Sequence, residues 1–217
     1  LKSGTVLVVG LGNRGVTPDS LGPRVAERVF VTRHIKEHMP EAFDFDIPSV
    51  CAIAPGVLGV TGVETMDIVF GVANKVKPDL IIAVDALASR RAARISTTIQ
   101  LSDSGISPGS GVGNTRADLS RANLGVPVIA VGVPLVVYAS TISQDTISLI
   151  ADETGLHGDE ARLRELAEQV IAKHMGDFIV TPKDIDVIVE DMAGIIANAI
   201  NSALFGNNLE QVRNMLA

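Results

Sequence analysis

Short runs of aliphatic residues alternate with helical patterns along this 217-residue chain, and this alternation constrains the fold more than any other feature. The run Thr5–Val9, which ends at Gly10, is typical of a strand buried on both faces, and Leu80–Val84 and Val126–Val131 have the same character. Parallel strands need long crossover connections, which are usually helices. The sequence therefore predicts an α/β fold with a mostly parallel central sheet covered on both faces.

The segments between these strands supply further predictions. The apolar stripe Val25, Ala26, Val29 and Phe30 predicts a helix that ends at Pro40. Thr181-Pro182 predicts the start of a final helix. In the first half, the other segments are predicted as a strand at 43–54, a loop at 56–62, a helix at 63–76 and a strand at 95–101. After a long loop at 102–116, residues 135–142 are predicted to continue toward a helix that ends near 150, and an exposed helix is predicted at 160–173.

Composition excludes several classes of protein. The 18 basic and 25 acidic residues give a net charge of −7, which argues against a nucleic-acid partner because phosphate neutralisation needs clustered Lys and Arg. The one cysteine, Cys51, excludes an internal disulfide framework and favours a reducing compartment. The apolar stretch Val126–Ile142 is interrupted by Pro127 and Pro134, which argues against a membrane span. We also find no signal-peptide pattern before Thr5.

A glycine motif follows the first predicted strand. Gly10–Gly15 fits G-x-G-x-x-G, the dinucleotide-binding fingerprint. In that fold the helix begins within the motif, whereas Pro18 and Pro23 delay it here, and no acidic residue lies about 20 positions further on. A tight turn that positions Asn13 and Asp19 is the favoured interpretation.

Three weaker patterns have simple structural explanations. His34 and His38 fit H-x-x-E-H, but histidines in the last turn of a helix are favoured by its dipole without any metal. Ser107 fits the centre of G-x-S-x-G, but a nucleophile elbow needs the backbone N–H that Pro108 lacks. Cys51 lies in an apolar strand pattern and is expected to pack in the core.

Two acidic residues are predicted to meet at one edge of the sheet. Asp19 lies in the loop after the first strand, and Asp85 directly follows the strand Leu80–Val84. Two carboxyls at close range can share a proton, so that the ionised one takes a proton from water while the neutral one donates to a scissile carbonyl. The alternatives are that Asp19 caps a helix and that Asp85 is a turn residue or a partner of Arg90 or Arg91.

Several long motifs, in the right order over most of the chain, resemble those of the germination protease family of spore endopeptidases. The matching segments are Gly10-Leu11-Gly12-Asn13, Val16-Thr17-Pro18-Asp19, Leu21-Gly22-Pro23, Val84-Asp85-Ala86-Leu87-Ala88-Ser89-Arg90, Gly109-Ser110-Gly111-Val112-Gly113-Asn114, Leu124-Gly125-Val126-Pro127-Val128-Ile129-Ala130-Val131-Gly132-Val133-Pro134 and Val180-Thr181-Pro182-Lys183-Asp184-Ile185-Asp186.

The resemblance implies a fold, an activity and a set of partners. The implied fold is a three-layer α/β sandwich similar to the hydrogenase-maturation peptidases, with residues 1–217 as a single peptidase domain. The implied activity is an aspartic-type endopeptidase, without a metal or cofactor, that degrades small acid-soluble spore proteins during germination. The family's proposed catalytic aspartates fall on Asp19 and Asp85. The resemblance also implies a precursor with a propeptide, a homotetramer and a place in the cytoplasm of the forespore.

Cleavage after a glutamate, which the resemblance implies, favours a basic contact with the substrate. Arg90 and Arg116 are the candidates for that contact. The backbone amides of Gly111 and Gly113 are expected to hold the substrate main chain, and Asn114 is expected to fix their loop. Asn13 is a further candidate.

The chain departs from the family pattern in three places. We expect it to lack the family's N-terminal segment with the propeptide. Tyr138 stands where an aspartate is expected, and Arg14-Gly15 replaces a bulkier pair, which is expected to loosen the first loop.

Three alternative functions stay open at this point. The first is a metal-dependent peptidase with Asp19 and Asp85 as oxygen ligands, since the related maturation enzymes recognise a metal at an equivalent place. The second is a nucleotide-binding oxidoreductase built on the glycine motif. The third is a non-catalytic relative that binds spore proteins.

Overall fold

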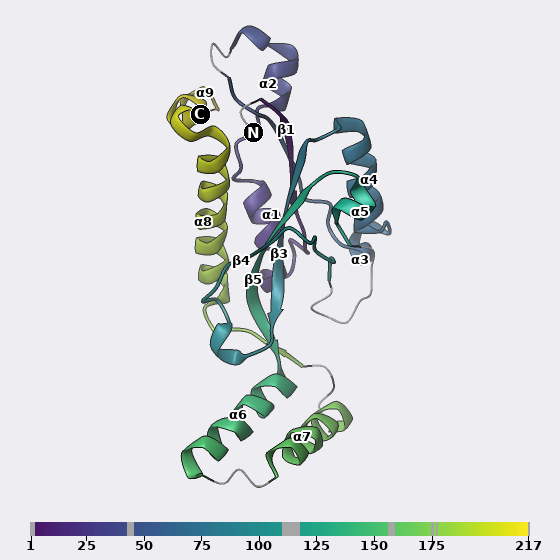
Figure 1. Cartoon of the computed structure of the whole chain (residues 1–217), viewed down its shortest axis with the longest axis vertical. Coiled ribbons are helices and arrows are strands. Elements are labelled where there is room, and N and C mark those ends of the chain that lie inside the picture. The colour runs from purple at the N-terminus through teal and green to yellow at the C-terminus, as the bar shows by residue number, and fades with distance from the viewer. Residues whose placement is uncertain are drawn as a thin grey trace.

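One mixed sheet organises the molecule (Figure 1). The computed structural model describes residues 3–42, 46–109, 118–155, 159–174, 176 and 178–216. Within them the strand order is β2-β1-β3-β5-β4, and β6 also pairs with β5. The strands are β1 Thr5–Gly10, β2 Ser49–Ile53, β3 Leu80–Ser89, β4 Gln100–Ser102, β5 Val128–Tyr138 and β6 Ile179–Val180. The neighbours β2, β1, β3 and β5 are parallel, and β4 and β6 pair antiparallel with β5. The predicted mostly parallel sheet is confirmed.

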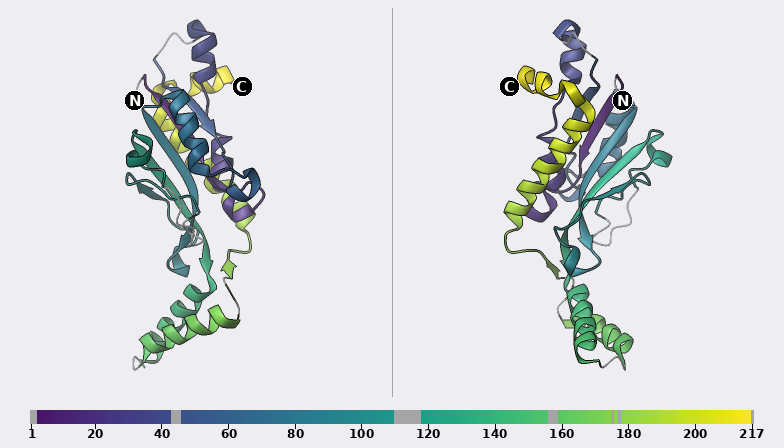
Figure 2. Two further views of the ribbon diagram at one scale, coloured as in Figure 1. Left: turned by 90° about the vertical axis from the view of Figure 1, so that its right-hand side faces the viewer. Right: turned by 60° about the vertical axis from the view of Figure 1, so that its left-hand side comes forward.

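Helices cover both faces of this sheet, so the three-layer α/β sandwich is also confirmed (Figures 1 and 2). Because side chains alternate along a strand, β1 supplies Val6 and Val8 to a core shared with α1 and α8, and Leu7 and Val9 to a core shared with α4. The helices are α1 Leu21–Ala26, α2 Arg33–His38, α3 Leu58–Thr61, α4 Thr65–Val76, α5 Arg121–Leu124, α6 Ala139–Thr154, α7 Glu160–His174, α8 Ile185–Phe205 and α9 Leu209–Leu216.

The pair α6 and α7 forms a helical hairpin beyond the end of β5 (Figure 1). The two helices pack against each other, and β6 then brings the chain back to the sheet beside Val137 and Tyr138. The exposed helix predicted at 160–173 is therefore confirmed as α7.

The helix predicted to run to Pro40 is instead two short helices, α1 and α2. Between them the buried Thr32 hydrogen bonds to the strand region: its hydroxyl donates to the Pro48 carbonyl at 2.8 Å and accepts from the Val50 N–H at 3.0 Å. The Thr32 backbone N–H also donates to the Val50 carbonyl. These tertiary hydrogen bonds replace those that a continuous helix would make.

Both central strands are longer than predicted. The strand β3 continues through Asp85 to Ser89, and β5 continues through Pro134 to Tyr138, where a helix was predicted to begin. The two pair along this whole length, with a register shift between Leu87 and Ala88, opposite Pro134. Mutual pairing therefore extends both strands past their most apolar segments, and a proline is tolerated where the ladder is irregular.

Several boundaries also differ from the predictions. The strand predicted at 95–101 is reduced to β4, because the 3-10 helix Ala92–Arg94 and the positive φ of Ser96 precede it. The predicted loop 56–62 contains α3, and the strand predicted at 43–54 is restricted to β2 in the described residues. The last helix, α8, begins at Ile185 rather than at Pro182. Residues 110–117 of the predicted long loop lie outside the described residues.

By length and composition alone, one described helical region could cross a membrane, namely Ile185–Leu216. This is weak evidence, because the core helix of a folded domain passes the same test. Seven α8 residues are buried, among them Val189, Ala193 and Ile196 in the core shared with α1. The Val126–Ile142 stretch considered in the sequence forms β5 and the beginning of α6.

Candidate active site

A cavity of about 530 Å³ lies where β1 and β3 end. Its walls are mostly apolar and come from segments far apart in the sequence, including the loop after β1, the α3–α4 region, β3 and the chain around β6. Among the described residues, Asp19 and Asp85 are the two acidic ones in this lining. The structure thus brings together the two carboxyl groups that the sequence predicts to meet at one sheet edge.

Asp85 lies inside β3, opposite Gly132 of β5, rather than after the strand as predicted. Its side chain is almost completely buried, with 5% of the residue exposed, and its Oδ1 accepts a hydrogen bond from the Ala86 N–H at 2.9 Å. Burial, with a further contribution from the charge of Asp19, raises the pKa of Asp85 to about 8. Asp85 is therefore mainly protonated at neutral pH.

Asp19 ends the 3-10 turn Thr17–Asp19 and is only partly buried. Burial raises the pKa of its carboxyl, while a hydrogen bond from the Asn13 N–H to Oδ2, at 2.6 Å, lowers it. Each carboxyl accepts one backbone hydrogen bond, so the smaller burial of Asp19 is what makes it lose its proton before Asp85 does. The cavity therefore contains two carboxyls of different proton affinity, and Asp85 is the one that keeps its proton to higher pH.

Glycines allow the loop that carries Asp19 to approach the sheet closely. A Cβ atom on Gly22, at the start of α1, would overlap the Leu11 backbone and lie 2.5 Å from the Val84 carbonyl oxygen. Gly12 has a φ of +113°, and a Cβ there would overlap the Asp19 carbonyl. The glycine motif therefore positions an acidic side chain, and the structure supports the tight-turn interpretation.

Of the other predicted site residues, the two that the structure describes lie outside the cavity lining. Asn13 is not in its lining, but its N–H holds Asp19 and its Oδ1 accepts from the Gly15 N–H at 2.9 Å. Arg90 is exposed and also lies outside the lining. The remaining four candidates lie outside the described residues: Gly111, Gly113, Asn114 and Arg116.

Sequence reasoning missed most of the cavity wall. Thr65, Val136, Ile179 and Thr181 line the cavity with the two acids. None of them belongs to a recognisable catalytic pattern, and Thr181 was interpreted only as a helix cap. Val136 and Ile179 are neighbours because β5 extends to Tyr138 and pairs with β6, a strand that the sequence analysis does not predict, whereas Thr65 comes from the start of α4.

The weaker patterns lie elsewhere. His34 and His38 are exposed on α2, and within the described residues no group of three or more His, Cys, Asp or Glu side chains could hold a metal ion. Cys51 lies on β2, partly buried, and its thiol contacts the Val6 carbonyl oxygen at 3.6 Å. Burial raises the pKa of this thiol, so Cys51 is a poor nucleophile.

Two departures from the family pattern have a structural outcome. The Arg14 side chain forms an exposed ion pair with Glu27, which links the first loop to the end of α1, and the expected loosening of that loop stays a prediction. Tyr138, the last residue of β5, does not line the acidic cavity. It lines a second cavity of about 100 Å³ beside the helical hairpin, together with Glu168 and Phe178.

The fold and this cavity define a class of protein: an α/β protein whose cavity contains two carboxyls that differ in proton affinity. The family model described as "Germination protease" matches residues 1–162 and 154–215. The chain belongs to the germination protease family.

Individual relatives agree. The germination protease of Clostridium acetobutylicum is 49% identical over 216 residues, which covers 94% of this chain and 66% of the relative. That of Caldanaerobacter subterraneus is 48% identical, covering 99% of this chain and 70% of the relative. That of Bacillus cytotoxicus is 42% identical, covering 94% and 67%. The chain thus spans about two thirds of the length of the curated relatives that it matches.

A crystal structure of a [NiFe] hydrogenase maturation protease, HycI from Thermococcus kodakarensis, aligns with 89% of this chain and 90% of its own. The TM-score is 0.44 and the sequence identity is 18%. With a similarity this low, the fold assignment rests on the observed sheet topology.

Proposed function

We propose that this chain, residues 1–217 acting as one peptidase domain, is an aspartic-type endopeptidase in which Asp19 is the general base and Asp85 the general acid. The observation that supports this most directly is the pair of carboxyls with different proton affinities in one cavity. Pairs of titratable groups whose surroundings separate their pKa values are the usual source of acid and base roles. Because the chain belongs to a protease family, we assign these acid and base roles to the hydrolysis of a peptide bond.

Hydrolysis then proceeds in two steps. Asp19 takes a proton from a water molecule whose oxygen bonds to the scissile carbonyl carbon, while Asp85 donates its proton to the carbonyl oxygen. The resulting diol collapses when the C–N bond breaks. The proton on Asp19 passes to the leaving nitrogen, and a hydroxyl proton returns to Asp85, which restores both groups.

The substrates, assembly and location remain part of the proposal. We propose small acid-soluble spore proteins as substrates, a homotetramer as the assembly and the forespore cytoplasm as the location. The germination protease names of the relatives support a role in spore germination. Arg90, Gly111, Gly113, Asn114 and Arg116 stay candidates for contacts with the substrate, and the apolar cavity wall offers surface to a polypeptide.

The pH dependence of cleavage tests this assignment. The active form has Asp19 ionised and Asp85 protonated, so kcat/KM should rise with pH as Asp19 ionises and fall as pH increases through about 8, where Asp85 loses its proton. The measurement is the initial rate of cleavage of a purified small acid-soluble spore protein across pH. A rate that keeps increasing well above pH 8 would show that Asp85 is not the general acid.

A further inference from the structure

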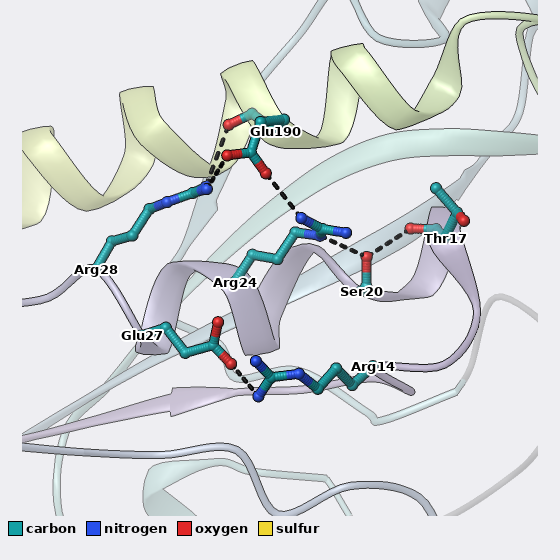
Figure 3. A network of polar contacts seen from close by, with 7 residues as sticks. All are labelled: Arg14, Thr17, Ser20, Arg24, Glu27, Arg28 and Glu190. Carbon is teal, nitrogen blue, oxygen red and sulfur yellow. Dashed lines mark hydrogen bonds and ion pairs between the residues drawn. The ribbon is translucent and has the colours of Figure 1, made fainter.

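The buried hydroxyl of Ser20 hydrogen bonds to the turn that carries Asp19 (Figure 3). Ser20, the next residue, is fully buried, and its Oγ donates to the Thr17 carbonyl oxygen at 2.8 Å. This bond spans the 3-10 turn Thr17–Asp19. The same Oγ accepts a hydrogen bond from Arg24 Nε at 3.1 Å. The Ser20 hydroxyl therefore links the geometry of the turn to the Arg24 side chain.

Arg24 connects this hydroxyl to α8. Its Nη1 contacts Glu190 Oε2 at 2.7 Å, while Nε remains on Ser20. Arg28 pairs with the other carboxylate oxygen of Glu190 and also donates to the Glu190 backbone carbonyl at 3.2 Å. Figure 3 shows the two arginines converging on Glu190 from the side of α1. The planar guanidinium of Arg24 donates to the Ser20 hydroxyl and to the Glu190 carboxylate at once, which a lysine ammonium on its flexible stem cannot do equally well.

The helix α8 is itself connected to the cavity. It begins at Ile185, shortly after Ile179 and Thr181, which lie in the cavity lining with Asp19 and Asp85. The contacts through Arg24 and Glu190 therefore join two parts of the chain that build the same cavity. One part carries Asp19, and the other leads from a wall of the cavity into α8.

We propose that Arg24 and Glu190 are positioning residues that hold the Asp19 carboxyl at its place beside Asp85, acting through the Ser20 hydroxyl. This inference rests on the proposed function of the two aspartates. Arg24 and Glu190 are partly exposed, with 38% and 49% of their side chains accessible. Exposed ion pairs contribute little to fold stability, whereas a small displacement of a reacting group lowers the rate strongly. The two residues should therefore affect turnover far more than unfolding.

Glu190→Gln and Arg24→Lys test the inference. Each should lower kcat for a small acid-soluble spore protein by about tenfold, with little change in KM or melting temperature. Glu37→Gln is a matched control, because Glu37 also pairs with an arginine, Arg33, and 46% of its side chain is accessible. That variant removes an ion pair on α2 and should cleave at the native rate.

A second readout does not depend on cleavage. The charge of Asp19 contributes to the high pKa of Asp85, so a displaced Asp19 should lower the pKa of Asp85 in a carbon-13 titration of Glu190→Gln. The inference is overturned if both variants keep the native kcat and the native Asp85 titration while Asp19→Asn is inactive. If Asp19→Asn itself cleaves normally, the proposed function fails, and the positioning role fails with it.

Discussion

Replacing either Asp19 or Asp85 by asparagine is expected to abolish cleavage. Asparagine has the same shape as aspartate but can neither accept a proton from water nor donate one as a carboxylic acid does. Loss of one such group should lower kcat by about 10³-fold. The measurement is turnover of a small acid-soluble spore protein near neutral pH, followed by mass spectrometry of the fragments. Asp103→Asn, which changes an exposed carboxylate away from the cavity lining, is the matched control and should be fully active.

The unfolding temperature of the variants distinguishes the loss of a catalytic group from the loss of the fold. Asp85 binds its proton up to about pH 8 in the folded chain, whereas its ordinary pKa is 3.8. Between these values the folded state holds a proton that the unfolded state has released, so this group destabilises the fold increasingly as pH rises. Asp85→Asn should therefore unfold at a higher temperature than the native chain at neutral pH, with a smaller difference in acid. Near-native turnover by either aspartate variant would refute the assignment.

Replacing Gly22 by alanine is expected to cause the largest loss of stability. Gly22 lies where α1 crosses β1 and β3, and a Cβ there would collide with backbone atoms of Leu11 and come within 2.5 Å of the Val84 carbonyl oxygen. Backbone atoms cannot rotate away, and the Leu11 N–H donates to that same Val84 oxygen at 2.8 Å. We expect destabilisation of about 4 kcal/mol, or roughly 10 °C in melting temperature.

Gly194→Ala is the control for that experiment. Gly194 lies within α8, and a Cβ at this position meets no heavy atom within 4 Å. Alanine favours a helix interior over glycine by about 0.5–1 kcal/mol, so this variant should be as stable as the native chain or slightly more so. Thermal unfolding of both variants decides the point. If Gly22→Ala had the same melting temperature as Gly194→Ala, the close approach of α1 to the sheet would not be the constraint that we describe.

Much of the site could be predicted because it follows from sheet topology. Thr5–Val9 and Leu80–Val84 are apolar without interruption, which indicates parallel strands buried on both faces, and parallel strands end at the same edge. Asp19 and Asp85 follow those runs closely, and they share one cavity. Which of them keeps the proton could not be predicted, because the difference comes from how deeply each carboxyl is buried in the folded chain.

What the sequence did not reveal depends on contacts between distant residues. Thr32 ends a helical pattern through hydrogen bonds to Pro48 and Val50, and local propensity contains no information about these partners. Arg24 and Glu190 are separated by 166 positions, so no motif could connect them. The long strand β5 follows from pairing with β3, although the sequence from Leu135 onward is predicted to continue toward a helix.

The protonation of Asp85 tests the central claim most directly. Carbon-13 labelling of the aspartate carboxyls would let each one be titrated by NMR in the native chain and in Asp19→Asn. We predict that Asp85 titrates near pH 8 in the native chain and at a lower pH once the charge of Asp19 is removed. An Asp85 carboxyl that titrates near 3.8, or one that does not respond to Asp19→Asn, would contradict the account.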